Sequence, residues 1–341
     1  MKSVRLGFTT LISSCAIGTI CLSQAAIAAP KVVASIAPIH SITAAIMDGI
    51  AEPDLLVELT GSPHSTQLRP SQVSELQEAD LIVWIGPNLE AFLDKPIDTL
   101  PKSAHVLTLT DAAGLKFLPV REGGNWERHE HDHEGEDHDA HEDHDHDDDH
   151  QHGEHEHEHG DDHEGHGDHH DDPHVWLDPI NAIEMAHAIT AELTELDPDN
   201  GSAYASNEKA FVEKLNSVID EATTSLEGLS DKPYFVFHDA YQYFEHRFGT
   251  NATGSVTLHP GVNPGAARVR EIHQKLSDAN AVCLFSEPQF SPKILSVLAE
   301  GTAAGISQLD PIGANLEPGP DLYPNLIRYN ANQLSKCLRE H

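Results

Sequence analysis

Histidine and acidic side chains dominate one stretch of this sequence. Residues 127–172 contain 22 acidic residues and one basic residue, and they hold 16 of the 26 histidines. Histidine is the commonest side-chain ligand for zinc-like metals, and the carboxylates around it attract divalent cations. The stretch lacks the apolar residues that a folded core requires. We therefore interpret residues 127–172, the histidine-rich tract, as a disordered loop that binds several zinc ions weakly.

Four residues outside the tract have the right types for one tight metal site. His64, His238 and Asp310 each follow a β-like run, and His174 lies just before a helical stretch. Three neutral imidazoles and a carboxylate or a water molecule complete the four-coordinate geometry of zinc. The sequence therefore predicts a zinc site made by these four positions, if the fold brings them together.

Short β-rich runs alternate with helical stretches on both sides of the tract. Strands are expected over 32–36, 55–59, 81–85, 105–109, 234–237, 252–257, 282–285 and 306–309. Helices are expected over 41–47, 71–78, 202–226, 265–277, 292–299 and 323–339, and another begins at Pro179. This alternation predicts an α/β fold with parallel sheets, which bind ligands beyond the carboxyl ends of their strands.

A long helix is expected between two β/α lobes. Phe211, Leu215, Val218 and Leu226 recur near helical spacing, as in a helix with one buried face. The expected divisions are an N-terminal lobe over 30–200, a linker helix over 201–228 and a C-terminal lobe over 232–341.

The first 28 residues have the pattern of a secretory signal peptide. Lys2 and Arg5 precede an apolar run, and small residues at 26–28 fit a cleavage site, so the mature chain is expected to begin near Ala29. Removing this leader leaves two cysteines, Cys283 and Cys337. In an exported protein they favour one disulfide over two buried thiols. A zinc site made from them lacks Cys or His partners at ligand spacing.

The charge of the chain limits the classes of partner. The formal net charge is −36, of which −21 lies in the tract and −15 elsewhere. The phosphates of nucleic acid repel such a surface. We therefore expect no nucleic-acid partner.

A set of motifs in a fixed order points to one family. They are Ser62-Pro63-His64 with Leu68-Arg69-Pro70, then 79–87, His174-Val175-Trp176-Leu177, 234–241, 285–290 and Leu309-Asp310-Pro311. With the acidic, histidine-rich insertion, they resemble the periplasmic zinc-binding proteins of bacterial ABC uptake transporters. The resemblance covers the whole mature chain.

This resemblance implies both a fold and a site. It implies two β/α lobes joined by a rigid long helix, with the metal held between them by His64, His174 and His238. It also implies a disulfide between Cys283 and Cys337. Some members have an acid before the first histidine, where this chain has Pro63, so Asp310 or a water molecule is the expected fourth ligand. Histidine at position 238 resembles the zinc-binding branch of the family more than the manganese-binding branch.

The expected function is that of a non-enzymatic receptor in the periplasm, which captures Zn²⁺ and delivers it to a membrane ABC permease. A periplasmic zinc chaperone is a further expected partner, and the chain is expected to be a monomer. Three alternatives remain: a manganese receptor, a secreted zinc storage or chaperone protein, and a secreted zinc hydrolase. The hydrolase needs a positioned general base, and the H-E-x-x-H matches at 129–133 and 155–159 lie in the tract, where no stable helix is expected.

Overall fold

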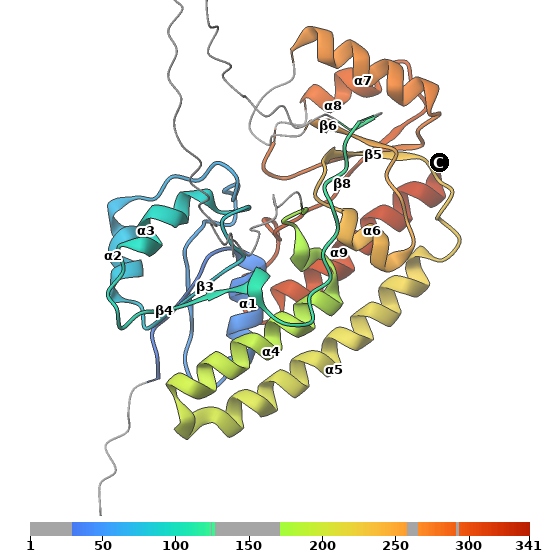
Figure 1. Ribbon diagram of the computed structural model, residues 1–341. Coiled ribbons are helices and arrows are strands. Elements are labelled where there is room, and N and C mark those ends of the chain that lie inside the picture. Colours follow the sequence, from blue (N-terminus) through green and yellow to red (C-terminus); the bar gives the residue numbers. More distant parts are fainter. Residues whose placement is uncertain (1–28, 124, 127–170, 258–264, 291–292) are drawn as a thin grey trace, which may run out of the picture.

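Two parallel sheets of four strands form the centres of two lobes (Figure 1). In the computed structural model the N-terminal sheet has the order β2-β1-β3-β4 and the C-terminal sheet has the order β6-β5-β7-β8. The strands are β1 Val32–Ala34, β2 Asp54–Leu55, β3 Leu81–Trp84, β4 His105–Thr108, β5 Tyr234–His238, β6 Gly254–Thr257, β7 Cys283–Ser286 and β8 Gly305–Gln308. Every pair is parallel. The predicted α/β fold with two lobes is confirmed.

The structure describes residues 29–123, 125–126, 171–257, 265–290 and 293–341. The expected signal peptide and nearly all of the histidine-rich tract lie outside the described residues. In the part that is described, no helix is both long and apolar enough to cross a membrane.

Helices connect the strands and fill the space beside the sheets. They are α1 Ala37–Ile46, α2 Pro70–Glu78, α3 Asp94–Asp98, α4 Pro179–Leu196, α5 Gly201–Leu226, α6 Gln242–Phe248, α7 Ala266–Asp278, α8 Lys293–Ala299 and α9 Leu322–Glu340. The long α5 packs against α1 and α4 as well as α9, which is the last element of the chain. Its buried residues include Phe211, Leu215, Val218 and Leu226, the set whose spacing predicted this helix.

One apolar core runs through both lobes. The same cluster of buried side chains contains Val83 of β3, Leu215 of α5, Phe285 of β7 and Leu334 of α9. Lobes that share a large apolar contact do not move freely against each other. The two sheets are therefore held at a fixed separation. The exact lobe limits drawn from the sequence stay a prediction.

A segment between β4 and the tract crosses to the C-terminal lobe, where it runs along the surface (Figure 1). The backbone N–H of Leu118 donates to the hydroxyl of Tyr243 at 3.0 Å. Further along, Arg121 forms ion pairs with Asp239 and Glu245 of that lobe. The chain therefore reaches the C-terminal lobe once before the tract and returns to it after α5.

Two local differences from the expected elements have clear causes. Strand β2 is shorter than expected because it pairs only with β1, which ends at Ala34. Helix α6 was not expected, since its run of aromatic residues from Tyr241 to Phe248 also suits a strand. It ends at Gly249, whose φ of 70° lies in the left-handed region that glycine adopts readily at helix ends.

A disulfide joins Cys283 of β7 to Cys337 of α9, across a separation of 54 residues. The bridge that the family resemblance implied is therefore present. It ties the last helix to a central strand of the C-terminal sheet.

Replacing both Cys283 and Cys337 with serine is expected to lower the free energy of unfolding by about 2–5 kcal/mol, because the open chain gains conformational entropy when it unfolds. Urea unfolding of the oxidised wild type and the double variant measures the difference. Reduced wild type is the control and should behave like the variant. Equal midpoints for oxidised and reduced wild type would contradict the prediction.

Candidate metal centre

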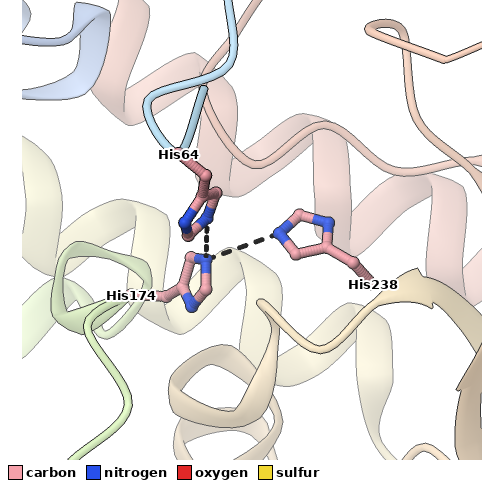
Figure 2. Close-up of side chains that lie close together, drawn as sticks. All are labelled: His64, His174 and His238. Atoms are coloured by element: carbon pink, nitrogen blue, oxygen red, sulfur yellow. Dashed lines mark hydrogen bonds between the residues drawn. The ribbon is translucent and has the colours of Figure 1, made fainter. Parts of the chain in front are cut away.

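Three histidines from distant parts of the sequence point toward one another (Figure 2). His64 lies in the loop after β2, His174 precedes α4, and His238 is the last residue of β5. The Nε2 atom of His174 lies 3.1 Å from that of His64 and 3.4 Å from that of His238. Two nitrogens bound tetrahedrally at the usual zinc–nitrogen distance of about 2.0–2.1 Å are roughly 3.3–3.4 Å apart. The spacing therefore suits one zinc ion.

His238 is fixed by a carboxylate from the neighbouring strand. Glu287 directly follows β7, and its two oxygens lie 2.7 and 2.8 Å from Nδ1 of His238. Both side chains are buried. Strands β5 and β7 lie side by side at the centre of the sheet, where the strand order reverses, and such a point in a parallel sheet is a usual ligand site. The topology of the C-terminal sheet therefore brings His238 and Glu287 together at the ends of its two central strands.

His174 is fixed in a similar way by Asp172. The Oδ1 atom of Asp172 lies 2.7 Å from Nδ1 of His174 and also accepts the backbone N–H of His174 at 3.0 Å. Burial raises the pKa of Asp172 to about 7, although the backbone N–H of His174 and the charge of Arg121 act in the opposite direction. The two contacts hold both the ring and the backbone of His174.

The segment around His174 is also tied to the C-terminal end of the chain. The indole Nε1 of Trp176 donates to the carbonyl of Pro311 at 2.8 Å, and the hydroxyl of Tyr323 donates to the carbonyl of Trp176 at 2.6 Å. All the atoms in these bonds are buried. His174 is therefore positioned by contacts with the loop before α9 and with α9 itself.

The carboxylates determine which ring nitrogens face the centre. With acids next to Nδ1, we assign the N–H of His174 and of His238 to Nδ1, so each Nε2 carries a lone pair. Two lone pairs 3.4 Å apart repel each other unless a cation lies between them. The arrangement therefore favours a positive charge at the centre, and carboxylate–histidine pairs of this kind are usual around bound zinc.

The pKa values of the two buried rings shift in opposite directions. Burial lowers the pKa of His174 well below its ordinary value, and the nearby His238 lowers it further. Burial acts in the same direction on His238, but the charge of Glu287 and its hydrogen bond outweigh that effect and raise its pKa. As the pH falls, His238 therefore takes up a proton before His174 does, and this proton has to leave when a metal binds.

His64 differs from the other two because it is exposed. Pro63 before it is buried, and the Thr66 hydroxyl donates to the carbonyl of Ser62 at 2.8 Å to close a turn. The histidine from the N-terminal lobe therefore lies on a surface loop, whereas the other two lie in the interior.

Asp310 does not join the three histidines. Its Oδ1 accepts the backbone N–H groups of Ile312 at 3.1 Å and Gly313 at 2.8 Å, and its Oδ2 accepts that of Asn315 at 3.3 Å. Both carboxylate oxygens are thus used to form a turn, a common role of aspartate. The structure therefore does not support Asp310 as the fourth ligand and leaves the other expectation, a water molecule. The contribution of Asp310 is to shape the loop that carries Pro311 and Ile312 to the site.

A small cavity adjoins the three rings. It is lined by Ser62, Pro63, Trp176, Glu287, Gln289, Phe290, Pro311 and Ile312 together with the histidines. A volume of about 20 Å³ is open there to the centre of a water molecule, and about 10–15 Å³ is enough to hold one water. With Asp310 elsewhere, a water molecule is the ligand that fits the fourth position.

Comparison with known proteins agrees with this geometry. The family model for ZnuA, the periplasmic component A of the zinc-uptake complex, matches residues 32–337. The chain belongs to this family. Among the ZnuA relatives, the high-affinity zinc uptake system protein ZnuA of Brucella abortus (strain 2308) is 50% identical over 307 residues, which are 90% of this chain and 91% of the relative. Members of the ZnuA family are components of a transport system, not enzymes.

Solved structures show how widely the fold is shared beyond ZnuA. A crystal structure of ZnuA superposes with a TM-score of 0.69 at 22% identity, over 91% of this chain and 99% of that one. FpvC of Pseudomonas aeruginosa, in complex with Mn²⁺, gives 0.70 at 18% identity, over 92% and 99%. These low identities support the fold alone. The metal preference therefore depends on the side chains at the site, which the shared fold does not determine.

The sequence pattern did not identify the two supporting acids of this ZnuA-type centre. Asp172 was assigned to the disordered tract, but Asp171 forms an antiparallel bridge with Pro119, and the Asp172 N–H donates to the carbonyl of Leu118 at 2.8 Å. This corrects the end of the tract, because 171 and 172 belong to the folded part. Glu287 had a readable signal, since it follows an expected strand as His238 does.

Asp172→Asn is expected to weaken zinc binding about 10–100-fold, because removing a partner that orients a ligand histidine typically has an effect of this size. Competition with a coloured chelator measures the dissociation constant. Asp171→Asn is the matched control: it removes the neighbouring charge without touching His174. Similar losses in both variants would show that only net charge matters.

Proposed function

We propose that this chain is a zinc receptor that binds one Zn²⁺ through Nε2 of His64, His174 and His238, with water as the fourth ligand. It then delivers the ion to a membrane ABC permease. The observation that carries the proposal is the convergence of three Nε2 atoms at zinc spacing. Membership of a family of periplasmic zinc-uptake components supports both the ion and the periplasmic location.

The ligand set favours zinc over manganese. Manganese prefers oxygen ligands, whereas imidazole nitrogens suit zinc. The described carboxylates nearest the rings, those of Asp172 and Glu287, are directed at Nδ1 atoms. Three nitrogens and a water molecule make a poor manganese site.

The cavity also lacks what a zinc hydrolase needs. Such an enzyme requires a general base beside the metal-bound water. Among the described residues that line the cavity, the only carboxylate is that of Glu287, and both its oxygens contact His238. We therefore favour a binding protein without catalytic activity. The expected zinc chaperone and the monomeric state stay predictions.

The test counts zinc ions in the full-length protein and in a variant lacking 129–170, after mild treatment with a chelator. The deletion keeps Asp171 and Asp172, because Asp172 supports His174. One tightly held ion in both proteins is expected. A deletion variant that retains no zinc would refute the receptor and favour storage by the tract.

Zinc affinity is expected to fall as the pH falls, beginning above pH 6.5, the ordinary pKa of histidine. The pKa of His238 is raised, so at pH values below it zinc has to displace a proton from the ring. One displaced proton weakens the apparent zinc affinity about tenfold for each pH unit. His174 adds little, since its pKa is low. Chelator competition between about pH 5.5 and about pH 8 measures the profile. An affinity independent of pH would argue against imidazole ligands.

A further inference from the structure

Gln289 presents a buried amide that makes no hydrogen bond with any residue that the structure describes. Both its Oε1 and its Nε2 atoms are inaccessible and without a partner among the described residues. Most buried polar side-chain atoms in proteins do have partners, and leaving one unpaired destabilises the fold. The exception therefore requires an explanation.

The place of this amide suggests one. Gln289 lines the same cavity as His64, His174 and His238, and that cavity has room for about one water molecule. It comes from the same strand end as Glu287, only two residues further along the chain. The turn after β7 thus supplies both the acid that orients His238 and a residue of the cavity lining whose amide is unpaired among the described residues.

The backbone around Gln289 is held on both sides. The N–H of Phe290 donates to the carbonyl of Glu287 at 3.2 Å. The ring of Phe290 stacks on Phe237, with centroids 4.5 Å apart and planes inclined by 14°, and it lies edge-on to His238 at 6.5 Å. These contacts hold the backbone that carries Gln289 beside the cavity.

We propose that Gln289 is a specificity-determining residue whose amide oxygen accepts a hydrogen bond from the water molecule bound to zinc. This inference rests on the proposed zinc site and extends it to the fourth ligand. Zinc makes its bound water a better hydrogen-bond donor by lowering the pKa of that water. An amide oxygen can accept this bond but cannot take the proton, so the water stays a simple ligand. A carboxylate in the same place would add an oxygen ligand and move the preference toward manganese.

Two substitutions test the proposal in the full-length protein. Gln289→Leu, which is close in size and lacks the amide, is expected to weaken zinc binding about 10–100-fold, the usual effect of losing a partner of a metal ligand. The metal-free variant should be at least as stable as metal-free wild type, because an unpaired buried amide has been removed. Gln289→Glu is expected to raise the Mn²⁺ affinity relative to the Zn²⁺ affinity.

Gln242→Leu is the matched control. Gln242 also has a buried, unpaired Oε1, but its Nε2 donates to the carbonyl of Pro119 at 3.1 Å and the residue does not line the cavity. Its zinc affinity should equal that of wild type.

The measurements are chelator competition with Zn²⁺ and Mn²⁺ and thermal unfolding without metal. If Gln289→Leu binds zinc like wild type, or if its affinity and its metal-free stability fall together, the proposal is wrong. In either case, tight zinc binding by wild type would still support the proposed three-histidine site. Failure of wild type to bind zinc would instead refute the proposed function.

Discussion

His238→Ala is expected to weaken zinc binding by about two to three orders of magnitude. Four-ligand zinc sites in small peptides bind with about 10–16 kcal/mol, so one ligand corresponds to roughly 3–4 kcal/mol, and each 1.4 kcal/mol is a factor of ten. The substitution also leaves Glu287 buried without the ring that it contacts. No other single substitution of a ligand or its partner should reduce binding more.

Chelator competition at neutral pH measures this loss, and zinc analysis of the purified variant provides a second reading. His273→Ala is the control: His273 is a half-buried residue of α7, its ring contacts the carbonyl of Glu300 at 2.8 Å, and it does not line the cavity. Binding by His238→Ala within a few-fold of the control would mean that the buried ring is not a ligand.

Arg121→Met is expected to lower the free energy of unfolding by about 3–5 kcal/mol, the usual cost of removing one partner of a buried ion pair. Arg121 is 15% exposed and pairs with Asp239 and Glu245, which are 11% and 4% exposed. Its guanidinium carbon lies 3.7 Å from the centre of the Trp126 ring. The substitution leaves two acids in the interior without their cation.

The pH dependence of this loss gives the prediction a second check. Burial already raises the pKa of Asp239 and of Glu245, and removal of Arg121 raises both further in the folded state. The folded variant then binds more protons than the unfolded chain, so it gains stability as the pH falls. Its deficit relative to wild type should shrink between neutral and acid pH.

Urea unfolding at both pH values measures the effect. Arg328→Met is the matched control, because Arg328 pairs with Glu221 at the surface, with side chains 33% and 51% exposed, and exposed pairs contribute only about 0–1 kcal/mol. Equal losses for the two arginine variants would show that Arg121 is no more important than a surface residue.

The alternation of strands and helices could be predicted from the sequence because each element depends on a local pattern of apolar and polar residues. The central strands β1, β3, β5 and β7 are short, mostly apolar runs, and helix α5 has a buried face at regular spacing. Helix α6 was missed because aromatic residues suit strands as well. Which strands lie at the centre, and hence which loops meet, is decided by contacts between distant residues.

The three histidines could be named in advance because two of them follow expected strands and the third lies just before an expected helix. The family resemblance then implied all three as ligands. Asp310 follows a strand too, and an Asp-Pro step suits both a metal ligand and a turn. Only the structure shows that its oxygens face backbone N–H groups. Asp172 was missed because it stands at the end of a tract made almost entirely of His, Asp and Glu, so nothing in the sequence distinguishes it from its neighbours. Gln289 gave no signal, since its amide matters only through what surrounds it.

The continuous core has a consequence for how quickly the ion leaves. His174 and His238 are buried, and their neighbours Val175 and Val236 belong to the core that both lobes share. His64 lies on an exposed loop after the shortest strand, where displacement costs least. If zinc binds as proposed, we expect displacement of that loop to govern the residence time of the ion. A permease that binds the loop would then shorten this time without separating the lobes.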